Sequence, residues 1–383
     1  MQVPVHVLEV DKEMGLKLAV CHDLLSVKGG AERVVLTVAR AFRAEVFTLL
    51  YDPSQAFEEA RGLKIHTLGD WKLPQDRRFY PWIYPFFHGW GILKFLGLDL
   101  RGYDAVFTSG KLGIFAKGEV TLHYCHSPPR FLYDLRPIVS LYLGRRYGSP
   151  VRALAELWWR GWRRMDEWAA RRPNLILANS LEVKKRIWRY YGREAEVVYP
   201  PVKVEKFRMK GGGEYFLAVQ RPSPEKRIEL LLRIFKRLPG ERLVLVGSYI
   251  DPDYTAWLEE KMRGMGNVSW LKEVSERELV ELYAGCKALV HTARREDFGM
   301  APVEAMASGK PVIAVNEGGV RETVVHGKTG LLVDPPYLKN FVRILKGFDP
   351  SLFSPRECRR RAEEFSEERF VRRMKELLGR MLG

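Results

Sequence analysis

Short runs of apolar, β-branched residues alternate along the whole chain with longer segments whose apolar residues recur every three to four positions. The short runs are typical of buried strands, and the longer segments of helices that cover them. This alternation predicts parallel sheets with helices on both faces, an α/β architecture. The predicted strands are Leu16–Cys21, Val46–Leu49, Leu63–His66, Ala105–Thr108, Val120–Cys125, Leu175–Ala178, Glu196–Tyr199, Tyr215–Val219, Leu243–Val246, Val268–Leu271, Ala288–His291, Val312–Val315 and Leu331–Val333. The predicted helices are Ala31–Phe42, Val151–Arg171, Leu181–Tyr191, Glu225–Leu238, Tyr254–Arg263, Glu276–Ala284, Pro302–Ser308 and Ser366–Leu382.

A proline pair and a glycine run separate the chain into two halves. Pro200 and Pro201 end the preceding strand, and Gly211–Gly213 predicts a flexible joint. We therefore expect an N-terminal domain at 14–200 and a C-terminal domain at 201–365, followed by the helix at 366–383. Residues 1–13 are expected to be an extension outside the fold. Open α/β sheets bind ligands beyond the carboxyl ends of their strands, so two such domains would present their binding loops to a common cleft.

Composition indicates a globular protein with an anionic partner. The chain has 383 residues, of which 46% are apolar and 29% charged, and this excludes a mostly disordered chain. The net charge is +16, and residues 101–200 alone carry 18 basic against 9 acidic residues. Nucleic acid, a membrane surface and a phosphorylated substrate all fit this excess, and net charge does not choose among them.

Cysteine usage and the N-terminus predict a cytoplasmic location. The four cysteines show no CxxC pairing, which argues for a reducing compartment and against a zinc site or a disulfide framework. The first residues lack the basic and apolar regions of a signal peptide. The strongest candidate for a membrane span is Phe79–Leu98, but prolines, His88 and Lys94 interrupt it. We favour a helix that packs in the core, with an interfacial segment as the alternative.

The loop Lys28–Arg33 follows the first strand and opens a helix. Gly29 and Gly30 would let the backbone approach a ligand, and the helix N-terminus offers unpaired N–H groups to an anion. The loop is not GxGxxG and lacks the acidic residue that a dinucleotide ribose requires, so NAD is disfavoured. A plain strand–helix turn explains the loop equally well when it is considered alone.

In the segment 292–333, Glu296 and Glu304 stand with seven residues between them. Pro302 fits the first position of a helix, which would place Glu304 in the first turn. The amides of Phe298, Gly299 and Met300 would then form a donor set for a diphosphate. Two carboxylates beside an anion site make sense if they accept hydrogen bonds from hydroxyls of a sugar and a ribose. For Glu304 alone, a favourable interaction with the helix dipole is the simpler explanation.

Two further segments suggest ligand contacts. In Arg221–Arg227, Pro224 is expected to start a helix with Lys226 in its first turn, where a cation is disfavoured unless Arg221 and Lys226 neutralise a phosphate. His126 ends a strand and could bind a sugar hydroxyl, although a structural histidine is common there. Asp251-Pro252-Asp253 superficially matches a DxD metal motif, but a helix start with Asp251 as N-cap explains it better. We assign no metal.

Together these segments resemble glycosyltransferase family 4, the retaining enzymes of the GT-B fold. The resemblance covers nearly the whole chain: KGGAERVV at 28–35, YCHSPPRF at 124–131, LILANSLEVKKRIWRYYG at 175–192, VVYPPVKVEKF at 197–207, QRPSPEKRIELLLRIF at 220–235 and EDFGMAPVEAMASGKPVIAVNEGGVRETVVHGKTGLLV at 296–333. The last block is highly specific, whereas GGAERV alone is weak. The first-half motifs look most like mannosyltransferase-type members that act on lipid-linked or polysaccharide acceptors.

The resemblance implies two Rossmann-like domains facing a cleft, with the terminal helix crossing back to the first. It places Glu296 near donor-sugar hydroxyls and Glu304 on the ribose. Arg221, Lys226 and Gly30, with its neighbour Gly29, would lie on the diphosphate, and His126 near the reacting sugar. Phe298, Gly299 and Met300 would supply backbone contacts, and Lys272–Val274 would hold the base. RPSPEK departs from the commoner R-L-x-P-x-K, and the segment Phe79–Leu98 is richer in aromatic residues than the family pattern.

The function expected from this resemblance is retaining transfer of a sugar, with GDP-mannose favoured as the donor and UDP-sugars as the alternative. The leaving phosphate would take the acceptor proton, so that no protein nucleophile or metal cofactor is required. The basic first domain and the aromatic segment suggest a glycan or polyprenyl-phosphate-linked acceptor and peripheral contact with the inner face of an anionic membrane. A nucleic-acid-binding protein is the less favoured alternative function, because no nucleic-acid-binding motif accompanies the positive charge, and we expect no nucleic-acid partner. An epimerase or phosphorylase would need catalytic groups that the sequence does not reveal.

Overall fold

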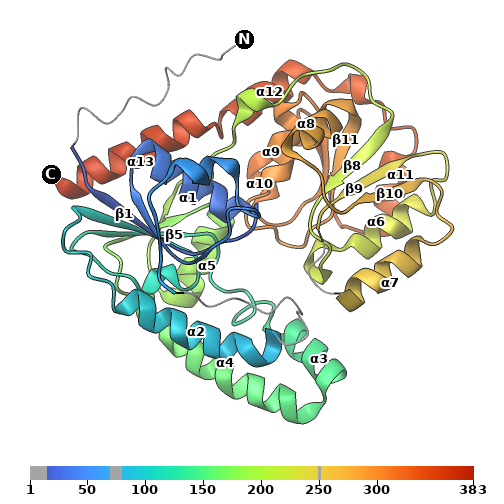
Figure 1. Cartoon of the computed structure of the whole chain (residues 1–383). Coiled ribbons are helices and arrows are strands. Elements are labelled where there is room, and N and C mark those ends of the chain that lie inside the picture. Colours follow the sequence, from blue (N-terminus) through green and yellow to red (C-terminus); the bar gives the residue numbers. More distant parts are fainter. Residues whose placement is uncertain (1–14, 70–79, 249–251) are drawn as a thin grey trace. The chain divides into compact units, whose positions relative to one another are not determined.

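A computed structural model describes residues 15–69, 80–248 and 252–383. The chain divides into two compact units (Figure 1). Unit 1 comprises Met1–Pro201 and Phe370–Gly383, and unit 2 comprises Val202–Arg369. The expected extension at residues 1–13 lies outside the described residues.

Unit 1 is built on a seven-stranded parallel sheet with the strand order β3-β2-β1-β4-β5-β6-β7. The first strand, β1, lies inside the sheet; β2 and β3 follow on one side of it, and β4 pairs with its other side. The topological switch point therefore lies between β1 and β4, where open sheets of this type bind ligands. The strands are β1 (Leu18–Leu25), β2 (Glu45–Tyr51), β3 (Ile65–Thr67), β4 (Ala105–Ser109), β5 (Thr121–Cys125), β6 (Leu175–Ala178) and β7 (Glu196–Val197).

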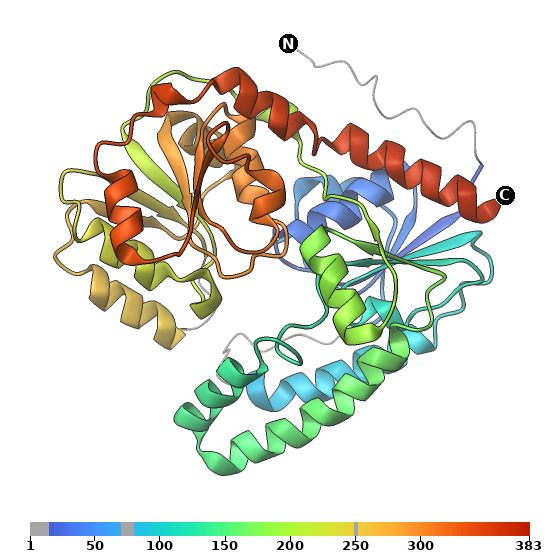
Figure 2. The same ribbon diagram turned by 180° about the vertical axis from the view of Figure 1, so that it is seen from behind.

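Helices cover both faces of this sheet, as Figures 1 and 2 show from opposite sides. Helices α1 and α13 share one hydrophobic cluster with the sheet, while α2, α4 and α5 pack on the other face. Alternate residues of the central strands face the two sides of the sheet, as the period of a strand requires. The helices are α1 (Gly30–Ala41), α2 (Tyr80–Leu96), α3 (Arg136–Tyr147), α4 (Ser149–Ala169), α5 (Leu181–Tyr191) and α13 (Glu367–Leu382).

The C-terminal helix α13 is an integral part of unit 1. Phe370, Met374 and Leu377 recur on one face of the helix and are buried in the cluster that α1 shares. Arg373 and Arg380 form ion pairs with Glu196 of β7. The last turns of the chain therefore stabilise the first unit by both apolar burial and charge pairing.

The aromatic segment Phe79–Leu98 forms helix α2, although Phe79 lies outside the described residues. Phe87 and Phe95 are buried in the core, and the His88 ring lies 3.8 Å from that of Trp162 on α4. Phe86 and Leu93 are exposed. Among the described residues, no helix combines the length and the apolar character that crossing a bilayer requires. The favoured interpretation, a core-packing helix, is confirmed for the residues that can be described.

Unit 2 repeats the doubly wound plan with a six-stranded parallel sheet in the order β10-β9-β8-β11-β12-β13. Its switch point lies between β8 and β11. The strands are β8 (Tyr215–Val219), β9 (Leu243–Val246), β10 (Val268–Leu271), β11 (Cys286–His291), β12 (Val312–Val315) and β13 (Gly330–Val333). Helices α6 (Ile228–Phe235), α7 (Pro252–Met262) and α11 (Leu338–Leu345) share one hydrophobic cluster with the sheet. The other helices of the unit are α8 (Glu276–Gly285), α9 (Met300–Ala307), α10 (Val320–Thr323) and α12 (Pro355–Glu363).

The glycine run that suggested a flexible joint is fixed to unit 2 instead. The buried Lys310 Nζ donates to the carbonyl oxygens of Lys210 and Gly212, at 2.7 Å each. A Cβ on Gly213 would lie 2.4 Å from the backbone of Cys286, so this glycine permits a close approach. The boundary between the units falls at Pro201 and Val202, beside the proline pair.

Candidate active site

The basic and acidic residues singled out in unit 2 follow two neighbouring strands. Arg221 and Lys226 come after β8, and Glu296 comes after β11, which pairs with β8 in parallel. The carboxyl ends of parallel strands lie at the same edge of a sheet, here at the switch point of unit 2. Lys226 and Glu296 contact each other directly, whereas the exposed Arg221 makes no hydrogen bond or ion pair with any described residue.

Lys226 and Glu296 form a tight ion pair. Lys226 Nζ lies 2.5 Å from Glu296 Oε2, and His291 Nε2, at the end of β11, lies 3.3 Å from the same oxygen. The side chains of Lys226 and Glu296 are only 22% and 15% exposed. A lysine ammonium has three donors, so Lys226 can hold Glu296 and still donate to a bound anion.

The surroundings keep Glu296 ionised. Burial alone would raise the pKa of this carboxyl, but the Lys226 charge and the His291 hydrogen bond outweigh it and hold the pKa well below its usual value. An ionised carboxylate accepts hydrogen bonds and donates none. Glu296 is thus suited to bind hydroxyl groups.

The loop that carries Lys226 differs from the prediction. Pro224–Lys226 form a 3₁₀ turn, Arg227 adopts a left-handed conformation with φ 53°, and helix α6 begins only at Ile228. The expected helix start at Glu225 is therefore wrong, and Lys226 does not sit in the first turn of an α-helix. Thr292 Oγ1 donates to the carbonyl oxygen of Lys226 at 2.9 Å, which ties this loop to the end of β11.

A pair of glycines holds the loop that carries Glu296. Gly319 N donates to Glu296 O at 2.8 Å, and Gly318 forms a parallel bridge with Glu296. A Cβ on Gly318 would lie 2.4 Å from Glu296 O, and one on Gly319 would lie 2.4 Å from Asp297 O. Gly318 also has φ +68°, which a glycine adopts without strain. These contacts require glycine at both positions and fix the backbone of the loop.

Helix α9 begins two residues earlier than predicted. Gly299 is its N-cap residue with φ 95°, and Met300 is its first residue, so the placement of Pro302 at the first helical position is wrong. A Cβ at Gly299 would be strained, because the left-handed region disfavours side chains. The Phe298 ring is buried against Phe365. Only the backbone of Phe298 could therefore contact a ligand.

Glu304 lies in the second turn of α9 rather than the first, and it is buried. Tyr283 of α8 donates a hydrogen bond to Glu304 Oε2 at 2.7 Å. One carboxylate oxygen thus has a protein partner. The predicted contact between Glu304 and a ribose stays a prediction.

Lys272 and Val274 follow β10, at the same carboxyl edge of the sheet and two strands away from β8. Lys272 pairs with Glu259 of α7 and lies 5.5 Å from the centroid of the Trp270 ring. Asp251 lies outside the described residues, and α7 begins at Pro252 as predicted.

In unit 1, the paired glycines lead into a polar cluster at the switch point. Gly29 is the N-cap residue and Gly30 the first residue of α1. Glu32, in the first turn, lies 3.7 Å from His22 Nε2 on β1. Burial opposes both charges, but their mutual attraction raises the pKa of His22 and lowers that of Glu32. These two side chains form an ion pair at the start of α1.

His126 belongs to the same cluster. Its Nε2 lies 2.9 Å from Ser109 Oγ at the end of β4, and Asn179 Nδ2 donates to its carbonyl oxygen at 2.8 Å. Removal from water lowers the pKa of His126 to about 3, and the nearby positive charge of His22 lowers it as well. His126 is therefore neutral at physiological pH.

Sequence reasoning missed several residues of both clusters. These are His291, Tyr283, Gly318 and Gly319 in unit 2, and His22, Glu32 and Ser109 in unit 1. His22, Ser109 and His291 stand at or near the carboxyl ends of strands beside a switch point. A search for polar residues at those positions would have found them.

Two family models match consecutive parts of the chain. "Glycosyltransferase Family 4" matches residues 28–206, and "Glycosyl transferases group 1" matches residues 202–349. Together they cover residues 28–349, which include every strand of both sheets except β1. The chain belongs to glycosyltransferase family 4. It is an enzyme that transfers a hexose, as the resemblance implied.

Curated relatives extend over most of this glycosyltransferase. Alpha-1,3/1,6-mannosyltransferase ALG2 of Mus musculus is 27% identical over 365 residues, covering 80% of this chain and 81% of the relative. The Homo sapiens protein of the same name is 26% identical over 417 residues, covering 92% and 94%.

Solved structures confirm the fold. Anabaena Alr3699/HepE in complex with UDP-glucose has a TM-score of 0.72 and 19% identity, covering 94% of this chain and 99% of that one. Sucrose-phosphate synthase from Thermosynechococcus elongatus has a TM-score of 0.68 and 19% identity, covering 95% and 98%. At this identity the likeness establishes the fold alone, and it confirms the predicted GT-B class with two Rossmann-like units.

Proposed function

We propose that this glycosyltransferase transfers mannose from GDP-mannose, with retention of configuration, to a glycan acceptor carried on a polyprenyl phosphate. The observation that carries the proposal is the Lys226–Glu296 pair at the switch point of unit 2. The names of the curated relatives, alpha-1,3/1,6-mannosyltransferases, support the choice of mannose.

The chemistry of unit 2 suits a sugar diphosphate. Glu296 would accept hydrogen bonds from hydroxyls of the donor sugar, while Lys226 and Arg221 would neutralise the diphosphate. The backbone at 298–300 opens helix α9, whose N-terminal dipole favours negative charge. As the glycosidic bond breaks, charge accumulates on the departing diphosphate, and fixed cations and amides stabilise that charge most.

The chemistry of unit 1 suits the reacting end of the acceptor. His126 is neutral and lies beside Ser109, so it can donate or accept a hydrogen bond to a hydroxyl without adding charge. Gly29 and Gly30 form the start of α1, where backbone N–H groups would donate to a phosphate oxygen. The leaving diphosphate would take the acceptor proton, and no protein base is required.

Donor choice can be tested by thermal shift with GDP-mannose, UDP-glucose, UDP-N-acetylglucosamine and ADP-glucose, because a ligand that binds the native state raises the melting temperature. We expect the largest rise with GDP-mannose. Product analysis with a polyprenyl-diphosphate-linked acceptor should then show one added mannose. A larger rise and turnover with a UDP-sugar would contradict the proposed donor.

We also propose that transfer needs no metal ion. Activity should be unchanged after dialysis against EDTA, because the cations of unit 2 would supply the charge that a metal otherwise provides. Loss of activity that Mg²⁺ or Mn²⁺ restores would contradict this part of the proposal.

A further inference from the structure

Helices α3 and α4 form an antiparallel hairpin, with the single residue Gly148 between them. Helix α3 was not among the helices expected from the sequence. Between residues 136 and 169 the chain has seven arginines and three acidic residues, so the hairpin carries a net charge of +4. This charge accounts for part of the basic excess of the first half, which the two clusters at the switch points leave unexplained.

The hairpin also exposes apolar side chains that a hairpin in water would be expected to bury. Leu154 and Leu157 of α4 are 61% and 65% exposed, and Ile138 and Leu141 of α3 are 41% and 49% exposed. Helix α4 also exposes Arg160 and Arg164, one and two turns after Leu157. Basic helices with exposed apolar residues are typical of surfaces that meet anionic lipid.

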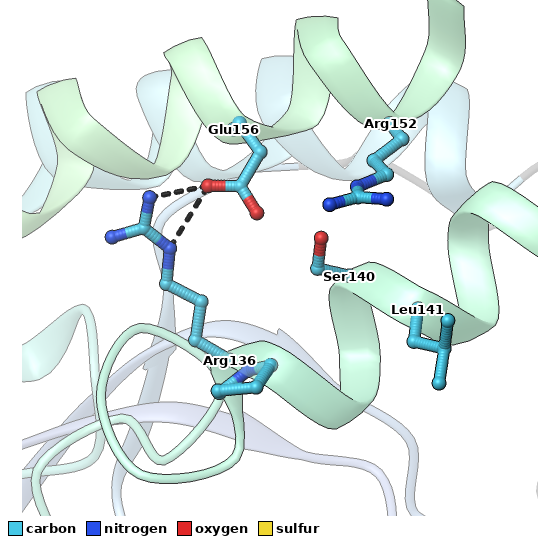
Figure 3. A pocket seen from close by; sticks show the side chains of 6 residues that line it. Arg136, Ser140, Leu141, Arg152 and Glu156 are labelled. Atoms are coloured by element: carbon cyan, nitrogen blue, oxygen red, sulfur yellow. Dashed lines mark hydrogen bonds and ion pairs between the residues drawn. The ribbon is translucent and has the colours of Figure 1, made fainter. Parts of the chain in front are cut away.

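A pocket of about 440 Å³ opens between the two helices (Figure 3), within the size range of small-molecule sites. Its lining contains two guanidinium groups, one hydroxyl and one carboxylate. The lining residues are Arg136, Pro137, Ser140, Leu141, Arg152 and Glu156.

Arg136 and Glu156 form an ion pair across the pocket, with Arg136 Nε 3.0 Å from Glu156 Oε2. Arg152 is left as the uncompensated charge. Its side chain packs on α3 at Gly144, where an added Cβ would lie 3.0 Å from Arg152 Cδ. This contact directs the guanidinium toward Ser140, as Figure 3 shows.

Ser140 adds a polar group that its surroundings do not fully use. It is 5% exposed and lies close enough to Glu156 to help lower the pKa of that carboxyl, which burial would raise and which Arg136 also lowers. Even so, Ser140 Oγ makes no hydrogen bond of ordinary geometry with any described residue. A buried hydroxyl beside a guanidinium is a suitable partner for a phosphate oxygen.

We propose that the α3–α4 pocket binds the phosphate of an anionic membrane phospholipid, through Arg152 and Ser140, while the exposed leucines enter the bilayer. The net charge of the pocket is +1, which matches one phosphodiester. The choice of a lipid as the source of the phosphate rests on the proposed membrane-linked function. None of the residues that line the pocket belongs to the donor site proposed in unit 2, so the two proposals can fail separately.

The test is co-sedimentation at low salt with vesicles of phosphatidylcholine alone or mixed with phosphatidylglycerol. The wild-type protein should bind only the mixed vesicles. R152Q should weaken binding at least tenfold. The matched control R160Q removes an exposed arginine of α4 that does not line the pocket, and it should cost no more than about fivefold, the value of one charge near such a surface.

Two further variants test the pocket and the lipid. E156Q removes the carboxylate that opposes an anion, so it should bind about fivefold tighter, a gain that misfolding does not produce. L157S should weaken vesicle binding although it leaves every charge in place. The thermal shift with GDP-mannose should be the same in all four variants as in the wild type.

If R152Q and R160Q lost equal vesicle binding, diffuse positive charge would explain the binding and the proposed pocket would be overturned. The same would follow if E156Q bound vesicles no more tightly than the wild type. Unchanged binding of L157S would overturn a lipid as the source of the phosphate. Equal binding to both kinds of vesicle, or to neither, would overturn the proposal entirely. If GDP-mannose did not raise the melting temperature of the wild-type protein, the proposed function would be contradicted instead.

Discussion

The polar clusters of the two units occupy equivalent places but use different chemistry. In unit 2 the switch point holds a cation and a carboxylate in direct contact, Lys226 and Glu296, on loops whose backbones are tied to each other and to Gly318. In unit 1 it holds neutral His126 beside Ser109, close to the pair of His22 and Glu32. Unit 2 is thus suited to a charged ligand, and unit 1 to hydroxyl groups.

The most severe change to this comparison is Glu296→Ala. We expect transfer to be abolished while the protein stays folded, because the variant loses the acceptor for sugar hydroxyls and leaves Lys226 unpaired. Activity and thermal melting measure the two effects. The matched control is Glu241→Ala, which breaks the pair of Glu241 with Lys287 at similar exposure, before β9 and at the start of β11. Wild-type turnover in Glu296→Ala, or equal loss in the control, would contradict the role of Glu296.

Gly318→Ala tests whether backbone contacts hold the unit 2 site. The new methyl group would lie 2.4 Å from Glu296 O at a position with φ +68°, so both a clash and strain are expected, with a loss of about 2–4 kcal/mol in the free energy of unfolding. Gly327→Ala is the control: it has φ +75° but open space around it, and should cost about 1 kcal/mol. Denaturant titration of both variants gives the comparison. Equal losses would show that strain alone matters at Gly318.

Acid should destabilise unit 1 through its neutral histidines. Burial lowers the pKa of both His123 and His126 to about 3, so between the unfolded value near 6.5 and pH 3 the unfolded chain binds more protons. Their stabilising contribution is complete above pH 6.5 and is lost as the pH falls toward 3. Each contributes a slope of about 1.4 kcal/mol per pH unit. His126→Gln should lower the slope of the free energy of unfolding against pH by about 1.4 kcal/mol per pH unit. An unchanged slope would contradict a neutral His126.

Tyr283→Phe should have the smallest effect. It removes the hydroxyl that donates to Glu304 and costs about 1–3 kcal/mol of stability, because a buried carboxylate oxygen loses its partner. If Glu304 also contacts the ribose, GDP should bind a few-fold more weakly. Calorimetric titration with GDP measures this, and unchanged affinity would argue against a ribose contact.

The strand–helix alternation was sufficient to predict both sheets, and six strands of unit 2 were placed within two residues of their ends. Buried parallel strands are short, apolar and β-branched, so their signal is local. The starts of α6 and α9 were wrong because Arg227 and Gly299 adopt left-handed conformations, which prolines nearby obscured. Helix α3 was not predicted because its apolar side chains show no clear period: Ile138 and Leu141 are exposed, whereas Val139 and Leu143 pack on the core.

The candidate site was predicted unevenly for a similar reason. In unit 2, Glu296, its loop and Glu304 lie in one contiguous segment and could be identified together, although their cation Lys226 comes from a separate segment. In unit 1 the cluster joins residues from β1, α1 and β4 with His126, which directly follows β5, and these lie far apart in the sequence. The pairing of His22 with Glu32 depends on strand order, and no local pattern reports it.

The central claim is that the Lys226–Glu296 pair binds a nucleotide sugar, with Glu296 on the sugar hydroxyls and Lys226 on the diphosphate. Calorimetric titration of Glu296→Gln with GDP-mannose and with GDP tests it most directly. The account predicts at least a tenfold loss of affinity for GDP-mannose, because an amide is a poorer acceptor for sugar hydroxyls, and an affinity for GDP that is unchanged or higher. Equal affinity for GDP-mannose in the variant and the wild type would contradict the account.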